Sequence, residues 1–330
     1  MAPVFVDVDT GVDDALALIY LLASPDADVV GIASTGGNVA VDQVCENNLG
    51  LLELCRRIDI PVSRGSVETL TGPIPAPSAV HGDRGLGYAD LPPADHRLTD
   101  YDSATAWVQA AHAFPGELIG VATAPLTNLA LALRAEPALP TLLSRLVIMG
   151  GAYDYRGNTT PVTEWNIGVD PEAAAEVFAA WSSNNADPQR LPILCGLDLT
   201  RRIAMTPDHL ARLAAAAGSN QANPLIRLID DAMRFYMEAY DRLGHGYAAH
   251  LHDPLAAAAA LDPQLIATQP ATVDVELTGT LTRGMTVTDW VGRWGREPNA
   301  HIGIRVDPDV FFDRFIERVG PFARRLGDHS

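Results

Sequence analysis

The chain has 330 residues, of which 48% are hydrophobic and 19% are charged, so it can bury a large core. Because no linker interrupts the sequence, we expect one domain over residues 1–330. Its formal net charge of −18 argues against nucleic-acid backbones and anionic membranes as partners, because both bind basic patches. No apolar run approaches the roughly 20 residues of a membrane span, so we expect a soluble protein. We also expect it to be cytoplasmic, because there is no signal-like segment and the only cysteines are Cys45, Cys55 and Cys195.

The first predicted elements are a strand and a buried helix within "VFVDVDTGVDDALALIYLLA" (residues 4–23). The β-branched and aromatic run ends in alternation, which places Asp7 and Asp9 on one face of the strand. A Thr-Gly turn follows, and Asp13 and Asp14 then begin an almost wholly apolar helix. The sequence therefore predicts a strand-to-helix junction crowded with acids.

These acids have two interpretations. Acids in the first turn of a helix face its dipole favourably, each by roughly 0.3–1 kcal/mol. Two like charges about 5 Å apart repel by roughly 3 kcal/mol at an effective dielectric near 20, so a converging group needs a positive partner. No Lys or Arg occurs before Arg56, which favours an oxygen-seeking divalent cation. The junction is either such a metal site or a solvated acidic turn.

Beyond the junction, apolar strand-like runs alternate with Ala-rich helical stretches, which predicts an α/β fold: an open, mostly parallel (mixed) sheet with helices on both faces. The strand-like runs cover residues 28–34, 116–123, 145–151 and 191–199, and the helical stretches cover 127–137 and 170–181. From about Thr272 to Asp307 alternation predicts extra strands, and "FFDRFIERVGPFARRL" predicts a closing helix.

Polar residues at strand ends are informative, because ligands of open α/β sheets bind there. Asn38 and Thr123 follow two of the predicted strands. Asn158, Glu164 and Asn166 lie in "GNTTPVTEWNIGVD", and the last two share a face if this piece is extended. A carboxylate with two amides suits hydroxyl groups. Neither a G-x-G-x-x-G nor a P-loop lysine is present, so nucleotide phosphates have no recognisable cradle.

Two Asp-Pro pairs precede helical stretches. Asp170 is interpreted as an N-cap and left out of the site. Asp253, taken alone, also favours a cap, while His252 beside it is a possible proton donor and His250 either packs or faces solvent. With no H-E-x-x-H, a zinc site is not indicated.

Seven fragments in order, "DVDTGVDDALAL", "STGGN", "HGDRGLG", "TAPLTN", "MGGAY…GN…EWNIGVDPEAA", "GLDLT" and "HDP", resemble the inosine-uridine preferring nucleoside hydrolases from about Val4 to Leu261. The resemblance implies a nucleoside hydrolase-like mixed α/β sheet, a homotetramer or homodimer, and cleavage of the N-glycosidic bond of ribonucleosides in purine and pyrimidine salvage. It also implies a calcium ion at the bottom of the pocket.

The resemblance further assigns roles to residues. Calcium would be held by Asp9, both oxygens of Asp14, the carbonyl of Thr123 and Asp253. Asp9 would accept the proton of the attacking water, and Asn38 would help to position that water. His252 would protonate the leaving base. The substrate would be held by Asp13 and Asn166 at the ribose hydroxyls near the metal, Asn158 and Glu164 at the 5′-hydroxyl, and His81 near the base, with a mobile wall containing Tyr236, Tyr240, His245 and Tyr247.

The chain departs from the family pattern in places. Thr10 replaces the usual proline, with no functional loss expected, and no Trp follows His81, which favours the inosine-uridine group over purine-specific relatives. Two other functions remain alternatives. An aspartate-based phosphohydrolase also opens on D-x-D, although Gly11 stands where Thr or Val is usual, and a non-catalytic calcium-dependent nucleoside or sugar-binding protein would keep the same pocket.

Overall fold

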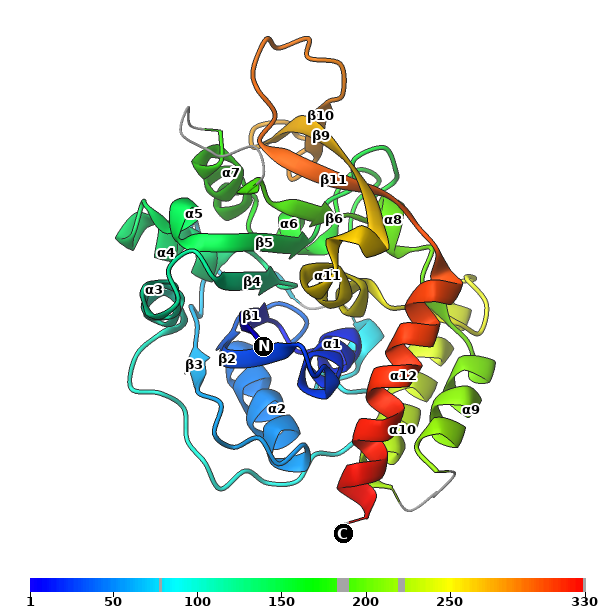
Figure 1. The fold of residues 1–330 in the computed structure, drawn as a ribbon. Coiled ribbons are helices and arrows are strands. Elements are labelled where there is room, and N and C mark those ends of the chain that lie inside the picture. The colour runs from blue at the N-terminus through cyan, green and yellow to red at the C-terminus, as the bar shows by residue number, and fades with distance from the viewer. Residues whose placement is uncertain (77–78, 183–189, 219–222, 329–330) are drawn as a thin grey trace.

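The computed structural model describes residues 1–76, 79–182, 190–218 and 223–328 (Figure 1). Its main feature is a nine-stranded sheet with the order β10-β9-β11-β6-β5-β4-β1-β2-β3. The strands are β1 (Ala2–Val8), β2 (Ala27–Ser34), β3 (Val62–Arg64), β4 (Leu118–Ala122), β5 (Leu143–Met149), β6 (Ile193–Cys195), β9 (Ile266–Val275), β10 (Thr286–Asp289) and β11 (Ala300–Val306). A separate antiparallel pair joins β7 (Ala204–Met205) to β8 (Ala249–His250).

Strand direction confirms the predicted mixed sheet. Every pairing from β3 across to β11 is parallel, and only β9 runs against its neighbours β11 and β10. The chain builds outward from β1 to β3 and then returns to place β4 on the other side of β1. This reversal is a topological switch point, where the loops after β1 and β4 diverge and leave room for a ligand.

Helices cover both faces of the sheet, as Figure 1 shows. The helices are α1 (Val12–Ala23), α2 (Val41–Leu54), α3 (Ser103–Ala113), α4 (Thr127–Ala135), α5 (Leu139–Leu142), α6 (Trp165–Val169), α7 (Pro171–Ala180), α8 (Leu197–Thr200), α9 (Pro207–Ala216), α10 (Pro224–Arg242), α11 (His252–Leu261) and α12 (Pro308–Gly327). One apolar core lies between the sheet and α1, α10, α11 and α12, and a second lies on the side of α3, α4 and α7.

Side-chain alternation along β1 decides which layer each residue meets. Val4, Val6 and Val8 enter the core on the α1 side, whereas Phe5 packs against Trp107 of α3 with ring centroids 4.6 Å apart. Asp7 points to the same side as Phe5 and accepts a hydrogen bond from Trp107. The strand ends at Val8, so Asp9 lies beyond it and not on the strand face that alternation predicts.

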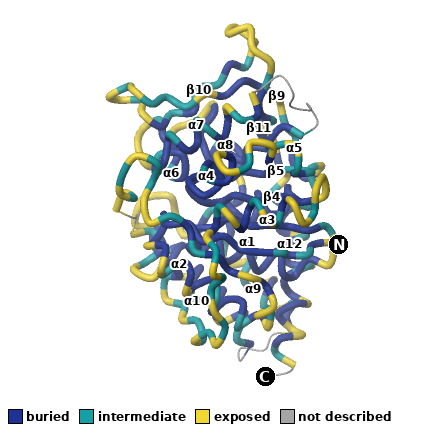
Figure 2. The backbone as a smooth tube through the Cα atoms, turned by 90° about the vertical axis from the view of Figure 1, so that its left-hand side faces the viewer, coloured by how far each residue is buried: buried dark blue, intermediate teal, exposed yellow. Residues whose placement is uncertain are grey.

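Helices α1 and α11 pack against each other in the centre of the protein. All 12 residues of α1 are buried, as expected from a sequence with no polar face after its first turn. In α11 the run Leu255–Ala260 is likewise buried, and its small alanines allow close approach to the sheet. Figure 2 shows this buried centre with exposed positions concentrated in peripheral loops.

The C-terminal prediction is confirmed by strands β9 to β11 and by α12, which packs on α1, α9 and α10.

One strand prediction was too long. In "LPILCGLDL" the strand ends at Cys195, and Leu197–Thr200 forms the short helix α8. Gly196 lies at this break, where a Cβ atom would approach the Tyr153 ring to 2.6 Å.

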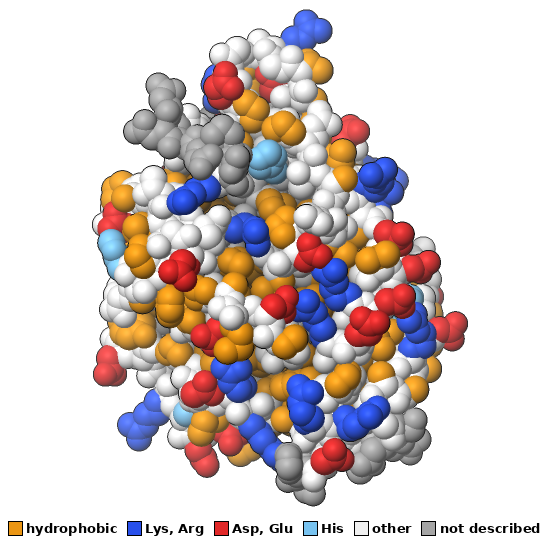
Figure 3. Space-filling view, viewed as in Figure 1, with side chains coloured by type: hydrophobic (Ala, Val, Ile, Leu, Met, Phe, Trp, Pro, Cys, Tyr) orange, Lys and Arg blue, Asp and Glu red, His pale blue; other side chains and the backbone are white. Residues whose placement is uncertain are grey.

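Both signs of charge occur on the surface (Figure 3). Acidic and basic side chains are interspersed on the face shown in Figure 3. Within the described residues, no helix is both long and apolar enough to cross a membrane.

We predict that Trp107→Phe lowers the free energy of unfolding by about 1–3 kcal/mol, because the smaller ring leaves a cavity and the Asp7 carboxyl loses a donor. Trp107 is 0% exposed and its indole nitrogen lies 2.8 Å from Asp7 Oδ2. Urea unfolding followed by circular dichroism measures this. Trp294→Phe, at a position 42% exposed, is the matched control and should change little. Equal midpoints for the two variants would show that the Trp107 contact is not stabilising.

Candidate active site

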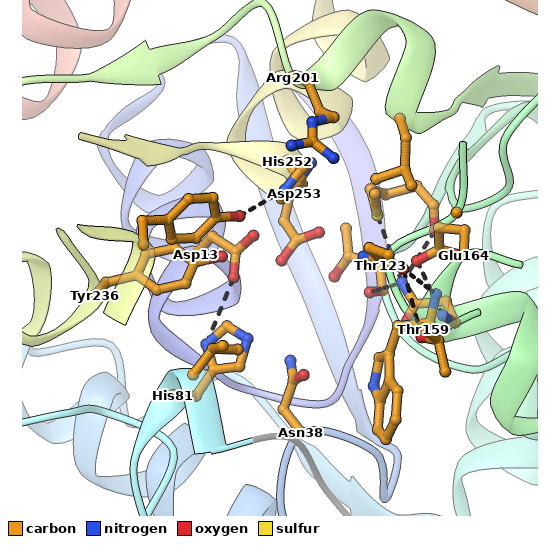
Figure 4. A pocket seen from close by; sticks show the side chains of 18 of the residues that line it. Asp13, Asn38, His81, Thr123, Thr159, Glu164, Arg201, Tyr236, His252 and Asp253 are labelled. Carbon is orange, nitrogen blue, oxygen red and sulfur yellow. Dashed lines mark hydrogen bonds and ion pairs between the residues drawn. The ribbon is translucent and has the colours of Figure 1, made fainter. Parts of the chain in front are cut away.

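A cavity of about 610 Å³ opens at the carboxyl ends of the parallel strands (Figure 4). Its lining includes Asn38 after β2, Thr123 after β4, Met149 at the end of β5 and Leu197 after β6. The cavity therefore lies at the switch point of the sheet, where the fold brings together loops distant in sequence.

Four aspartates form the floor of the cavity: Asp13 and Asp253 line it, and Asp9 and Asp14 lie buried beneath them. Asp13 and Asp14 come from the first turn of α1, Asp253 comes from the first turn of α11, and Asp9 directly follows β1. Oxygens of Asp13, Asp14 and Asp253 all lie within 4.8 Å of one another. Asp9 contacts Asp14 from the side, and the side chains of Asp13 and Asp253 contact each other.

The protonation of these acids reflects their burial. Burial raises the pKa of Asp13 to about 8, with the Asp14 charge adding to it. Burial also raises the pKa of Asp9 and of Asp253 well above the usual range, again with neighbouring carboxylates contributing. Four carboxylates cannot all be ionised so close together without a positive partner.

Within the described residues, none of these four carboxylates forms an ion pair with Lys or Arg. A hard cation suits these four carboxylates, because carboxylate and carbonyl oxygens are the ligands that Ca²⁺ prefers.

Asp253 is not a helix cap: α11 begins at His252, its N-cap position is Leu251, and no side chain caps it. The cap interpretation of Asp253 was therefore wrong, since the residue sits inside the first turn.

Short hydrogen bonds hold the floor in place. Asp14 accepts from the Gly11 amide at 3.0 Å and from the Thr123 hydroxyl at 2.7 Å. Asn38 bridges two acids, since its backbone amide donates to Asp9 at 2.8 Å and its side-chain amide lies 3.2 Å from both Asp9 and Asp14. Asn38 thus positions the acids themselves in addition to lining the cavity. A Cβ at Gly37 would collide with the Asp9 carboxyl.

Asp7 supports the floor from behind. Its carboxyl accepts hydrogen bonds from Thr35 at 2.6 Å, Trp107 at 2.8 Å and Asn128 at 3.2 Å. Burial raises its pKa to about 6, and these three donors lower it in part. Asp7 does not line the cavity, so it acts on the site through the packing of β1.

The polar wall is formed by the segment before and within α6. Glu164 is the N-cap of α6 and accepts from the backbone amides of Gly151 at 2.9 Å, Asn166 at 2.9 Å and Ile167 at 3.1 Å. Glu164 and Asn166 would share a face only on an extended segment, and that condition is not met, because Asn166 lies in the first turn of a five-residue helix. Both side chains nevertheless line the cavity.

The amide of Asn166 donates to the Thr123 carbonyl at 2.7 Å and to the Met149 carbonyl at 3.2 Å. In the described part of the chain its Oδ1 accepts no hydrogen bond, so this atom is available to a ligand. The Asn158 side chain accepts from the Trp165 amide at 2.9 Å and also lines the cavity. The Trp165 indole nitrogen is buried with no partner among the described residues, which marks a further donor at this wall.

The opposite wall is aromatic. His252 Nδ1 lies 2.6 Å from the Thr200 hydroxyl, and its Nε2 lies 3.2 Å from the Tyr240 hydroxyl. Tyr240 in turn meets Tyr236 edge-on, with ring centroids 5.0 Å apart. Burial, followed by nearby positive groups, lowers the pKa of His252 well below its usual value. His252 is therefore neutral at pH 7 in the free protein.

His81 connects this wall to the floor. The Val12 amide donates to its Nδ1 at 3.1 Å, which places the ring proton of a neutral His81 on Nε2. The same Nδ1 lies 3.9 Å from Asp13 Oδ1, but an atom that accepts from Val12 carries no proton for an ion pair. Burial lowers the pKa of His81 to about 4, in agreement with a neutral ring.

Among the mobile-wall candidates, Tyr236, Tyr240 and His245 line the cavity, whereas Tyr247 does not and is 46% exposed. His250 also lies outside the lining, with its ring 5.2 Å from that of Tyr240.

Sequence reasoning missed other lining residues, among them Trp165, Tyr155 and Arg201. Trp165 stands between two predicted site residues, and Arg201 directly follows "GLDLT". Position next to a recognised motif was the only signal that could have identified them.

Comparisons with known proteins agree with this geometry. The family profile described as inosine-uridine preferring nucleoside hydrolase matches residues 4–313. The pyrimidine-specific ribonucleoside hydrolase RihA of Salmonella arizonae is 36% identical over 319 residues, which are 96% of this chain and 98% of that protein. The purine-preferring ribonucleoside hydrolase from Gardnerella vaginalis has a TM-score of 0.89 at 30% identity, covering 98% of this chain and 99% of that one.

A plant nucleoside hydrolase, PpNRh1, has a TM-score of 0.88 at 30% identity, covering 97% of this chain and 99% of that one. Profile, sequence relatives and structures all span nearly the whole chain and confirm the resemblance. The protein therefore belongs to the inosine-uridine preferring nucleoside hydrolase family, enzymes that act on the N-glycosyl bonds of ribonucleosides.

Proposed function

We propose that this enzyme hydrolyses inosine and uridine to the free base and ribose with the help of a calcium ion. The observation that carries the proposal is the convergence of Asp13, Asp14 and Asp253 oxygens within 4.8 Å at the floor of a cavity of about 610 Å³. The relatives' names point in two directions, since the Salmonella enzyme is called pyrimidine-specific and the Gardnerella enzyme purine-preferring. We therefore include both purine and pyrimidine nucleosides in the proposal. We also propose that the enzyme is cytoplasmic and that its one-domain chains form a homo-oligomer.

The proposed ion ligands are Asp9, Asp14, Asp253 and the Thr123 carbonyl, with an Asp13 oxygen also within reach of the same point. When bound, calcium would offset the carboxylate charges and lower the pKa of a water molecule. The buried carboxyl of Asp9 is the proposed acceptor of that water's proton, because it contacts Asp14 and so lies beside the proposed ion.

The ribose is proposed to lie between the floor and the polar wall. Asn166 Oδ1 and the Asp13 carboxylate would accept hydrogen bonds from ribose hydroxyls, while Asn158 and Glu164 would hold the 5′-hydroxyl. As the C1′–N bond breaks, positive charge gathers on the sugar, and the floor carboxylates stabilise it. Water adds to C1′ and the bond electrons leave with the base.

The leaving base is proposed to meet the aromatic wall. His252 lies 3.2 Å from the Tyr240 hydroxyl, and both line the cavity. A proton held between these two groups can reach the base directly from the imidazole or through the tyrosine hydroxyl. Since the free His252 is neutral, the pair must take up one proton from solvent in each turnover, which it passes to the base as the C1′–N bond breaks, so that the base leaves neutral and the pair returns to its starting form.

The ion assignment predicts that Asp14→Asn and Asp253→Asn each lose tight calcium binding together with activity, because each removes a charge from one site. Metal content after dialysis is the measurement. Asp208→Asn is the matched control, since Asp208 is also an acid in the first turn of a helix but is exposed. Stoichiometric calcium in both floor variants would overturn the ligand set.

Removing Asn166 should separate ribose binding from metal binding. We expect Asn166→Ala to keep calcium but to lower kcat/KM by about 10²-fold, since hydrogen bonds to a ribose hydroxyl are lost at the reacting sugar. A 2′-deoxynucleoside should be a poor substrate of the unmodified enzyme for the same reason. The reading fails if Asn166→Ala loses its calcium or if deoxyribose is accepted as well as ribose.

A donor that protonates the leaving base should matter only for bases that leave poorly. His252→Ala is therefore expected to slow inosine hydrolysis by about 10²–10⁴-fold while affecting p-nitrophenyl riboside much less. Steady-state rates on both substrates, with calcium content checked in parallel, give the answer. Parallel losses on both substrates with calcium retained would instead assign His252 a supporting role.

A further inference from the structure

Arg201 is a cavity residue that the proposed reaction does not yet use. It caps the C-terminal end of α8, its amide donating to the Leu197 carbonyl, and its half-buried side chain lines the cavity. Figure 4 shows Arg201 at the upper edge of the cavity beside His252. Its charge reaches the aromatic wall, since it lowers the pKa of His252 and His250.

The guanidinium of Arg201 lacks a carboxylate partner. Within the described residues it makes no hydrogen bond or ion pair, and its one ring contact places its carbon 5.3 Å from the centroid of Tyr155. Some other arginines of this acidic chain pair with acids, as Arg64 does with Asp42 at 2.7 Å and Arg57 with Asp59 at 3.1 Å. Arg201 therefore presents a permanent charge and free N–H donors to the cavity.

The platform under Arg201 is built by the fold. Asp198 of α8 accepts the backbone amides of Tyr153 at 2.8 Å and Asp154 at 2.6 Å. These bonds fix the segment that carries Tyr155 against α8. Thr200, the residue before Arg201, bonds to His252. Arg201 is thus held between the aromatic wall and the Tyr155 ring.

We propose that Arg201 recognises the exocyclic oxygen of the nucleobase and so selects keto bases over the corresponding amino bases; this inference rests on the function proposed above. A guanidinium donates only, so it pairs with a carbonyl oxygen and opposes an amino group. When the C1′–N bond breaks, its electron pair passes to the base and spreads onto that oxygen. The fixed positive charge of Arg201 then stabilises the departing base more than the bound substrate.

Two substrate pairs that differ in one group test this. Inosine and adenosine differ at C6, uridine and cytidine differ at C4, and each pair exchanges an oxygen for an amino group. The unmodified enzyme should favour the keto member of each pair in kcat/KM. Arg201→Ala should reduce this preference about 10- to 100-fold, mainly by slowing the keto substrates, because a charge-assisted hydrogen bond is lost. Arg201→Lys should retain part of it.

The neighbouring Arg202→Ala is the matched control, because Arg202 is exposed and outside the cavity lining, and it should leave both ratios unchanged. Thermal unfolding and calcium content of each variant show whether the fold and floor survive. An unchanged keto preference in Arg201→Ala, or an equal loss on all four substrates, overturns this inference alone. Failure of the unmodified enzyme to release ribose from any of the four overturns the proposed function and this inference with it.

Discussion

The arrangement of this protein depends on one electrostatic constraint: three buried aspartates meet at one point and a fourth contacts one of them, with no arginine or lysine paired to them among the described residues. Two apolar helices, α1 and α11, bring Asp13, Asp14 and Asp253 there, because each helix is buried and carries its acids only in the first turn, and Asp9 joins them from the residue that follows β1. Both helix N-termini point at the floor, and their dipoles favour negative charge. That effect is about 2 kcal/mol per acid at most, too little to offset the mutual repulsion of four carboxylates. A cation or protons must make up the difference.

The surrounding residues hold the acids rather than neutralise them. Asn38, Thr123 and the Gly11 amide bind Asp9 and Asp14, and Asp7 fixes β1 through Trp107 and Asn128. Such a preorganised floor is unfavourable for the stability of the free fold, since uncompensated buried charge is destabilising. An ion that binds only the folded state would return that stability by mass action. The same strain makes the floor chemically useful, because fixed carboxylates can stabilise a positively charged sugar without rearranging.

Short sequence patterns predicted the features that depend on neighbouring residues in the chain. The junction from Asp7 to Asp14 could be predicted because strand, turn and helix follow one another within a few residues. The alternation of strand-like and helical runs predicted the sheet and the helices that cover it. The place of Asp253 could not be predicted in this way. Its position before a proline is typical of a helix N-cap, and only the packing of α11 on α1 brings it to Asp13. Glu164 and Asn166 were identified by residue type, but the helix that carries Asn166 was not predicted, since a helix of five residues is too short for periodicity to show. Arg201 carried no motif at all, and its role follows only from the cavity it faces.

Proton release on calcium binding tests the central claim most directly. With the pKa of Asp13 at about 8 and those of Asp9 and Asp253 also raised, the free floor holds protons at pH 7 that a cation must displace. Calorimetric titration of metal-free protein with Ca²⁺, repeated in buffers of different ionisation enthalpy, counts them. The account predicts one ion per chain, release of about one proton or more at pH 7, and less release at pH 9. No binding, or binding with no proton released at pH 7, would contradict it.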